Sequence, residues 1–280
     1  MEKSKERLEI LEKIDEFERM GKFDQDVEND PPTIPLNPSD VDYLHRKITS
    51  KIKTRVANHI ARKFIKNLMK EKKLIIKDVI GLENLDNIKN GFILTCNHFN
   101  AFDNFALHEV LEVYLKKNKK RFFKVIREGN YSFPGLYGFF FRNCDTLPLS
   151  SNFNTMKKFT DAINIILKRG DVVLVYPEQG MWWNYKKPRP LKPGAFRYAV
   201  KADVPVLPCF ITMNDSDILD DNGFYVQEYT LHFSKPIYPN KEMSIKESIE
   251  KMTEENYQIW KEIYENTYQI PLVYKTEVTK

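Results

Sequence analysis

Cysteine is scarce in this sequence, and long apolar runs are missing. Its three cysteines among 280 residues lie far apart, which excludes a disulfide framework or a zinc-binding spacing and favours a reducing compartment. No apolar run approaches the ~18–20 residues that cross a bilayer. The charged start, residues 1–4, is followed by no apolar segment, so we expect no signal peptide. With no evident repeat or low-complexity tract, the sequence predicts a folded protein on the cytosolic side.

Positive charge is concentrated in one segment. Residues 44–73 hold eleven Lys or Arg and one acid, whereas the whole chain carries only +5, so the remainder is acidic overall. Apolar residues recur every four positions along this segment. Because an α-helix has 3.6 residues per turn, the stripe that they form would rotate around the helix by about 40° per step and about 200° in all. We therefore expect this helix to break, or to bury only one half against the rest of the protein. The stripe consists of Ile48, Ile52, Val56, Ile60, Phe64 and Leu68.

Two functions fit this basic helix. It suits an interfacial helix on an anionic membrane, and it equally suits an ordinary helix that covers the domain with solvated lysines. No recognition motif or base-stacking module accompanies the charge, so we expect no nucleic-acid partner.

The chain divides into an N-terminal helical extension, residues 1–75, and a main domain, residues 76–280. Residues 1–30 favour an acidic amphipathic helix, and prolines between 31 and 38 predict a stiff linker. Pro38, Ser39 and Asp40 are typical of a helix start. From Lys77 onward strands and helices alternate, which indicates an α/β fold with a layered sheet of mostly parallel strands and flanking helices. We expect strands at 91–97, 121–127, 145–149, 171–176, 204–212 and 228–235, and helices at 103–118, 153–169, 194–202 and 244–268.

His98 and Asp103 stand where the strand at 91–97 gives way to the next helix. Ligands of open α/β sheets bind at the carboxyl ends of strands. A carboxylate against one imidazole nitrogen would leave the other nitrogen free to take a proton from a hydroxyl. A purely structural histidine is the alternative that this pair alone leaves open.

Four ordered blocks surround and follow this pair. They are Asn97-His98 with Asp103 five residues later, residues 138–142 with 146–149, residues 173–180, and residues 192–195 with 204–208. Together they resemble the signature blocks of the glycerolipid acyltransferases, the family of 1-acylglycerol-3-phosphate acyltransferase. The resemblance covers residues 78–236. It implies that His98 is the base and Asp103 its orienting group, in direct acyl transfer without an acyl-enzyme.

The resemblance also implies the substrates. A fatty acyl group would pass from acyl-CoA or acyl-carrier protein, as co-substrate rather than cofactor, to the hydroxyl of a lysophospholipid, in phospholipid biosynthesis. No metal is implied. Glu178 would bind the acceptor's hydroxyls or glycerol backbone, and Gly180 would allow close approach of a ligand. Asn97 would donate a hydrogen bond or cap its loop, and Arg142 would bind an acidic group or form a structural salt bridge.

The sequence departs from the family pattern at the acceptor's expected phosphate site. Ser150 and Ser151 stand where the family pattern has an Asp-Arg pair. Where the family pattern has Gly-Thr-Arg, Gln179 is inserted before the glycine, and Met181 and Trp182 follow it. Basic residues just downstream would supply the missing charge or form an exposed loop. These residues are Lys186, Lys187 and Arg189. An acceptor without phosphate therefore stays open.

Further alternatives remain for several residues and for the function. The aromatic segment, residues 131–141, suits an acyl-chain pocket, a lipid interface or plain core. Trp182 and Trp183 suit an interfacial contact, and Cys96 suits a buried small residue better than a nucleophile.

A thioester or lipid hydrolase would use the same His–Asp pair, and a non-catalytic lipid-binding protein would use only the basic helix and the aromatic segment. We expect a peripheral membrane enzyme on the cytoplasmic side.

Overall fold

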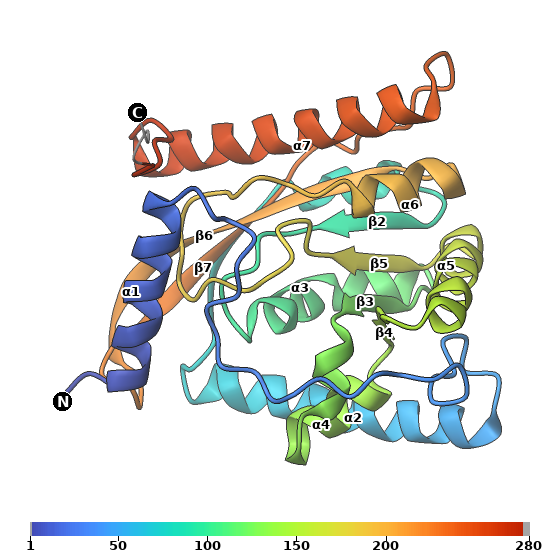
Figure 1. Cartoon of the computed structure of the whole chain (residues 1–280), viewed down its shortest axis with the longest axis horizontal. Coiled ribbons are helices and arrows are strands. Elements are labelled where there is room, and N and C mark those ends of the chain that lie inside the picture. Colours follow the sequence, from blue (N-terminus) through green and yellow to red (C-terminus); the bar gives the residue numbers. More distant parts are fainter. Residues whose placement is uncertain (1, 277–280) are drawn as a thin grey trace.

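A computed structural model describes residues 2–276 and shows a mixed α/β layered fold (Figure 1). Its seven-stranded sheet has the order β1-β7-β6-β2-β5-β3-β4, in which β6 and β7 pair antiparallel and all other neighbours pair parallel. The strands are β1 (Ile75–Ile80), β2 (Phe92–Thr95), β3 (Phe122–Ile126), β4 (Thr146–Pro148), β5 (Val172–Val175), β6 (Val206–Leu219) and β7 (Tyr225–Phe233). The α-helices are α1 (Lys5–Arg19), α2 (Ile48–Lys70), α3 (Asp103–Lys117), α4 (Gly135–Asn143), α5 (Phe153–Lys168), α6 (Gly194–Ala202) and α7 (Ile245–Tyr268).

The central strands β2 and β5 are apolar because helices cover both faces of the sheet. Alternate residues of a strand point to opposite faces. Leu94 and Leu174 accordingly join one core cluster with α2 and α3, while Ile93 and Val173 join the other with α5, α6 and α7. Strands buried on both sides are near-continuous runs of apolar residues, as parallel sheets require. The predicted α/β fold with a mostly parallel sheet is thus confirmed.

Most predicted elements lie where they were expected. Strands β2 to β5 and helices α3, α5 and α6 match their predicted ranges within two residues. β7 begins at Tyr225, three residues before its predicted start, and three further elements differ. β6 continues to Leu219 because it forms a long antiparallel pair with β7, ending where Leu219 faces Tyr225. β1 and α4 were not predicted, since β1 pairs only with the distant β7 and α4 lies within the aromatic segment.

The N-terminal extension wraps around the domain. The predicted helix over 1–30 ends at Arg19, just before Gly21, which has a φ of +65°. The next 28 residues cross the face of the molecule without an α-helix before reaching α2 (Figure 1). The helix start expected at Pro38 is wrong. Residues 38–40 form a turn, and Asp42 accepts the backbone N–H groups of Arg46 and Lys47 ahead of α2.

The basic helix α2 does not break over its 23 residues. The drift of its apolar stripe is resolved by burying one half, which was one of the two expected outcomes. Leu68 is buried and Phe64 is partly buried against the main core. Ile48 and Ile52 remain 75% and 56% exposed, and Val56 and Ile60 are exposed as well. The N-terminal half of α2 therefore presents an uncovered apolar stripe among basic residues.

Glu128 fastens the linker to the domain. Its carboxylate accepts the backbone N–H of Leu36 at 2.7 Å, the Ser150 hydroxyl at 2.7 Å, and the Ser151 N–H and hydroxyl at 3.1 and 2.9 Å. Burial opposes ionisation of Glu128, but these hydrogen bonds outweigh it and hold the pKa of the carboxyl below its usual value. Ser150 and Ser151 thus hold a structural carboxylate.

Replacing Glu128 with alanine should lower the free energy of unfolding by about 2–3 kcal/mol, because four donors lose their acceptor at once. Urea unfolding at neutral pH measures the loss, and the exposed Glu262→Ala on α7 is the matched control. Since the pKa is lowered in the folded state, the wild-type advantage should be present at neutral pH and disappear as pH falls through the lowered pKa. Equal stability of the two variants would contradict the role of Glu128 as a fastening point.

Candidate active site

The site lies at the carboxyl ends of β2 and β5, which are parallel neighbours. Two loops leave these strands side by side. The N–H of Trp182 donates to the carbonyl of His98 at 3.1 Å, and the N–H of Asn184 donates to the carbonyl of Phe99 at 2.8 Å. Backbone hydrogen bonds between the loops therefore hold His98 at the edge of the sheet, where open α/β folds bind ligands.

His98 and Asp103 are brought together as predicted. Nδ1 of His98 lies 2.7 Å from Oδ2 of Asp103, across the turn into α3. The same Oδ2 accepts the N–H groups of Phe99 and Asn100 at 3.2 and 3.4 Å, and the Asp103 side chain is fully buried. A buried carboxylate beside Nδ1 favours the tautomer with its proton on that nitrogen. Nε2 is then the basic atom.

Tyr176 completes the arrangement and was not among the predicted site residues. Its hydroxyl donates to Oδ1 of Asp103 at 2.6 Å, and its ring stacks on the imidazole of His98 with centroids 4.0 Å apart. Burial and the Asp103 charge raise the pKa of Tyr176 well above its ordinary value, so the phenol stays a neutral donor. Its place directly after β5, the neighbour of β2, was the signal that could have identified it.

His98 opens into a cavity of about 910 Å³, within the range of small-molecule and cofactor sites. Its side chain is 22% exposed, and within residues 2–276 no hydrogen bond engages Nε2. Four members of the aromatic segment line the cavity, so a lining role is among the outcomes that the sequence left open. The aromatic lining from or next to α3 and α4 consists of Phe102, Phe105, Phe133, Tyr137, Phe140 and Phe141, and Tyr176, Trp183 and Tyr198 line the cavity as well.

Glu178 and Arg189 form a buried ion pair behind the histidine loop. Their side chains lie 3.3 Å apart, and neither lines the cavity. Oε1 of Glu178 accepts the N–H of Arg189 at 2.7 Å, and Oε2 accepts the N–H of His98 at 3.1 Å. In this structure Glu178 therefore positions the backbone of His98, and Arg189 neutralises Glu178 instead of facing the cavity.

The predicted residues Asn97 and Arg142 are engaged by the protein backbone. The Asn97 amide donates to the carbonyl of Ile211 at 3.0 Å and accepts the N–H of Ile211 at 2.8 Å. Arg142 donates to the carbonyls of Tyr131 and Phe133 at 2.6 and 2.9 Å. Neither side chain lines the cavity, so Asn97 joins β2 to β6 and Arg142 closes the turn before α4.

The predicted basic residues downstream of Gly180 also lie outside the cavity. Lys187 pairs with Glu18 of α1 at 2.5 Å, and Lys186 lies 5.7 Å above the ring of Tyr268. Gly180 does line the cavity. The residue before it, Gln179, has a positive φ of +70°.

Trp182 and Trp183 are buried and do not form the interfacial contact that the sequence suggested. They pack with Ile10 and Ile14 of α1 and with Val27 in a separate core cluster. Helix α1 therefore lies beyond the carboxyl ends of β2 and β5, against the site (Figure 1). The N-terminal extension forms part of the wall around the cavity.

Cys96 is fully buried, and burial raises the pKa of its thiol well above the ordinary value. A thiol in this state is a poor nucleophile, which favours the structural role over a covalent mechanism. Across residues 2–276, no group of three or more His, Cys, Asp or Glu is arranged to hold a metal ion. None of the helices of this described part is long and apolar enough to cross a membrane.

The cavity contains cationic side chains that were not among the predicted site residues. They are Arg7, Lys124, Arg127 and Lys192. Arg127 follows β3 directly, and Lys192 precedes α6. A cation directly after a strand that ends at the same edge of the sheet as His98 is the signal that could have identified Arg127.

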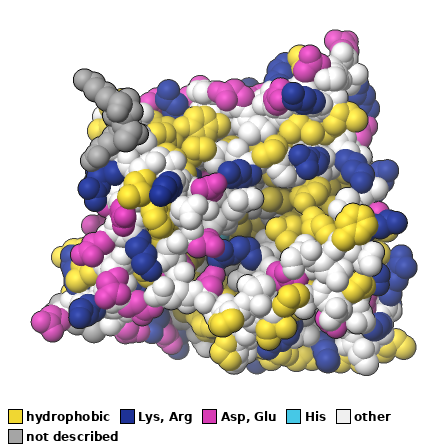
Figure 2. All heavy atoms as spheres, viewed as in Figure 1, with side chains coloured by type: hydrophobic (Ala, Val, Ile, Leu, Met, Phe, Trp, Pro, Cys, Tyr) yellow, Lys and Arg dark blue, Asp and Glu magenta, His cyan; other side chains and the backbone are white. Residues whose placement is uncertain are grey.

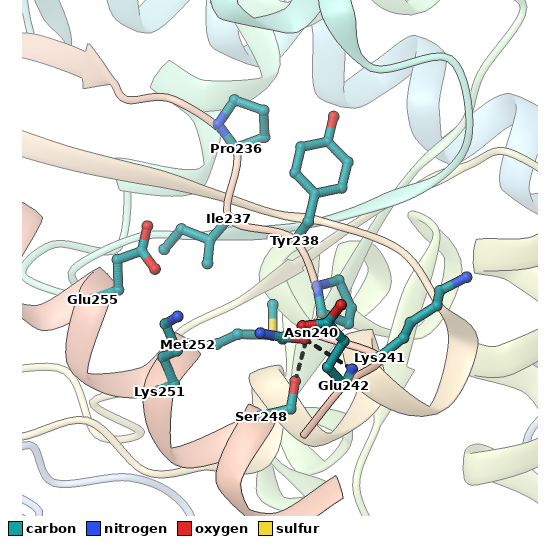
Figure 3. Close-up of a pocket in the computed structure, with 11 residues that line it drawn as sticks. Pro236, Ile237, Tyr238, Asn240, Lys241, Glu242, Ser248, Lys251, Met252 and Glu255 are labelled. Atoms are coloured by element: carbon teal, nitrogen blue, oxygen red, sulfur yellow. Dashed lines mark hydrogen bonds between the residues drawn. The ribbon is translucent and has the colours of Figure 1, made fainter. Parts of the chain in front are cut away.

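A second cavity, of about 460 Å³, lies between α7 and the loop after β7 (Figure 3). Backbone and side-chain hydrogen bonds organise its loop: the N–H of Asn240 donates to Ser248 at 3.1 Å, and the N–H of Glu242 donates to Asn240 at 2.9 Å. Lys251 and Glu255 border it. It includes none of the predicted site residues.

The sequence matches the Acyltransferase family over residues 77–212. Among solved structures, the chain is similar to the 1-acyl-sn-glycerophosphate (LPA) acyltransferase PlsC from Thermotoga maritima. The TM-score is 0.52 and the sequence identity 23%, over 82% of this chain and 87% of that chain. No curated protein matches the sequence. The matched range contains His98, Asp103 and Tyr176, whereas α1 and α2 precede it.

Proposed function

Since this chain belongs to the acyltransferase family, we propose that it transfers a fatty acyl group from a thioester to the hydroxyl of a lysophospholipid. The thioester would be acyl-CoA or acyl-carrier protein. The observation that carries the proposal is the His98–Asp103 pair, with Nδ1 and Oδ2 2.7 Å apart, opening into a cavity with an aromatic lining. That lining suits an acyl chain, and Nε2 suits the hydroxyl that receives it.

The proposed reaction proceeds in two proton transfers. Nε2 of His98 takes the proton of the acceptor hydroxyl as its oxygen attacks the thioester carbon, and a C–O bond forms. The C–S bond then breaks, and the leaving thiolate takes the proton from the imidazolium. Asp103 stabilises the imidazolium between these transfers, as a buried carboxylate does for a catalytic histidine. The products are the acylated lipid and a free thiol.

Thiol release tests this function. Acyl-CoA and acyl-carrier protein are each offered with and without a panel of lysophospholipids that differ in headgroup, and acylated lipid is quantified. Release that depends on an acceptor and yields acylated lipid supports the transferase. Release of free fatty acid without any acceptor would instead establish a hydrolase. No release with any pair would overturn the assignment.

We propose further that α2 holds the enzyme on an anionic membrane surface. The exposed stripe of Ile48, Ile52, Val56 and Ile60 would enter the lipid interface. Lysines and arginines along the same helix would contact anionic headgroups. An apolar surface of this kind on an amphipathic helix favours association with lipid over full exposure to water.

Ile52→Asp combined with Val56→Asp should lower binding to phosphatidylglycerol vesicles at least tenfold, because two charges replace the apolar contact. Co-sedimentation measures the effect, and Val113→Asp, also an exposed apolar residue but on α3, is the control. Binding of the wild type should weaken with added salt. Unchanged binding by the double variant would show that α2 is not the membrane contact.

A further inference from the structure

An acidic segment, residues 23–30, lies along one wall of the cavity and is firmly attached to it. The carbonyl of Gln25 accepts Nε1–H of Trp182 at 2.9 Å, and the carbonyl of Phe23 accepts a guanidinium N–H of Arg189 at 3.1 Å. Val27 is fully buried in the cluster formed with α1 and the two tryptophans. Because this cluster is a small hydrophobic core, the acidic segment is a fixed part of the site.

The carboxylates of this segment engage the cations that line the cavity. Arg127 pairs with Asp26 at 2.5 Å and with Asp30, and Lys192 pairs with Asp24 at 3.2 Å. Figure 2 shows acidic and basic side chains next to each other along the path that the N-terminal chain follows in Figure 1. Arg7, a third cation that lines the cavity, pairs with Glu28 of the acidic segment at 2.9 Å.

Gly180 makes room for one of these carboxylates. A Cβ atom at this position would lie 2.7 Å from Oδ1 of Asp26, which is closer than real Cβ atoms approach. In this structure the group that comes close to Gly180 is the carboxylate of Asp26, whereas the sequence predicted the close approach of a ligand. The absence of a side chain at Gly180 thus leaves the space that this carboxylate of the N-terminal extension occupies.

Lys124, another cation that lines the cavity, does not offset the negative charge of the acidic segment at the carboxyl edge of the sheet. Lys124 on β3 pairs with Leu174 on β5, and Leu174 pairs with Leu94 on β2. Lys124 is therefore level with Leu94, which precedes His98 by four residues. Burial lowers the pKa of Lys124. It lies below the carboxyl edge, whereas Arg127 lies at it.

Carboxylates outnumber cations along the cavity. Six acids face four cations, and three of those cations are already paired with the acidic segment. A phosphate monoester carries roughly −1.5 to −2 charges at neutral pH, as a phosphorylated side chain does. If its phosphate took Arg127, Asp26 and Asp30 would lose their partner, and the dianionic phosphate would lie beside like charges that repel it. The acids are Glu6, Asp24, Asp26, Glu28, Asp30 and Asp220.

We infer that the preferred acceptor is a zwitterionic lysophospholipid, whose headgroup carries an ammonium group as well as a phosphate. The phosphodiester would bind Arg127, and the ammonium group would bind the carboxylates that Arg127 releases. Each charge of the ligand then replaces a charge of the protein, and none is left unpaired. This inference rests on the proposed acyl transfer to a lysophospholipid and specifies which headgroup the site selects.

The test compares three acceptors with the same acyl chain: 1-acylglycerophosphoethanolamine, 1-acylglycerol-3-phosphate and 1-monoacylglycerol. The wild type should show kcat/KM at least tenfold higher for the phosphoethanolamine than for the phosphate monoester. Asp26→Asn combined with Asp30→Asn should shift this ratio at least tenfold toward the phosphate monoester. The control is Asp15→Asn, a carboxylate that pairs with Arg19 and Lys275 outside the cavity and should leave the ratio unchanged.

The outcomes separate the two proposals. Preference for the phosphate monoester or for monoacylglycerol, or a ratio that Asp26 and Asp30 do not influence, would overturn the zwitterionic acceptor while leaving acyl transfer established. Acylation of none of the three would overturn the proposed function itself. Because the asparagines have nearly the shape of the aspartates, thermal unfolding should confirm that the double variant is folded.

Discussion

Alanine in place of His98 is expected to lower kcat for acyl transfer by about 10²–10⁴-fold, the usual contribution of a general base. The variant should stay folded, because Asp103 keeps its other donors. Tyr176 and two backbone N–H groups still bind the carboxylate, so no buried charge is left without partners. Steady-state thiol release at saturating acyl-CoA measures kcat, and thermal unfolding checks the fold.

The matched control is His59→Ala, an exposed histidine on α2 that does not line the cavity. It should keep wild-type turnover in detergent micelles, where membrane attachment does not limit the reaction. Turnover within a few-fold of wild type in the His98 variant would remove the histidine from the mechanism, whatever the fate of the control.

Local patterns were enough to predict the central strands and the close approach of His98 and Asp103. β2 and β5 are short buried apolar runs whose period and length identify them without tertiary information. His98 and Asp103 are five residues apart across a strand-to-helix turn, so one local geometry brings them together. Both features are encoded by neighbouring residues, which is why sequence alone could place them.

Charge partners could not be predicted in the same way. Lys187 and Arg189 are basic residues near the site in sequence, but their partners, Glu18 and Glu178, depend on how the chain folds. Arg127 binds two aspartates that precede it by about a hundred residues. Long-range ion pairs leave no periodic pattern, so a basic residue in a loop looks equally available whether it is buried and paired or open to a ligand.

The N-terminal extension shows the same limit for apolar residues. Trp182 and Trp183 follow a loop beside the site, and exposure at a lipid interface was a reasonable expectation for them. They are buried because α1, more than 160 residues earlier, packs Ile10 and Ile14 against them. The amphipathic pattern of α1 indicated a buried face but carried no information on its partner.

Asparagine in place of Asp103 is expected to lower kcat by roughly 10- to 150-fold. Three donors converge on Oδ2, from His98, Phe99 and Asn100, so the amide oxygen should take that position and keep the loop and the imidazole in place. The amide nitrogen would then face Tyr176, whose hydroxyl can turn to accept. What is lost is the negative charge that stabilises the imidazolium. A hydrogen bond to a charged group contributes about 1.5–3 kcal/mol, and each 1.36 kcal/mol is tenfold in rate.

The size of this effect distinguishes two roles for the carboxylate. If Asp103 only caps the loop, Asp103→Asn keeps full activity while Asp103→Ala, which removes the acceptor for all these donors, loses both activity and stability. If it also stabilises the imidazolium, Asp103→Asn falls between the wild type and His98→Ala in kcat, with unchanged thermal stability. The exposed Asp161→Asn on α5 serves as the control for both measurements. We expect the intermediate kcat, because Oδ2 lies 2.7 Å from Nδ1 with its charge enclosed by protein.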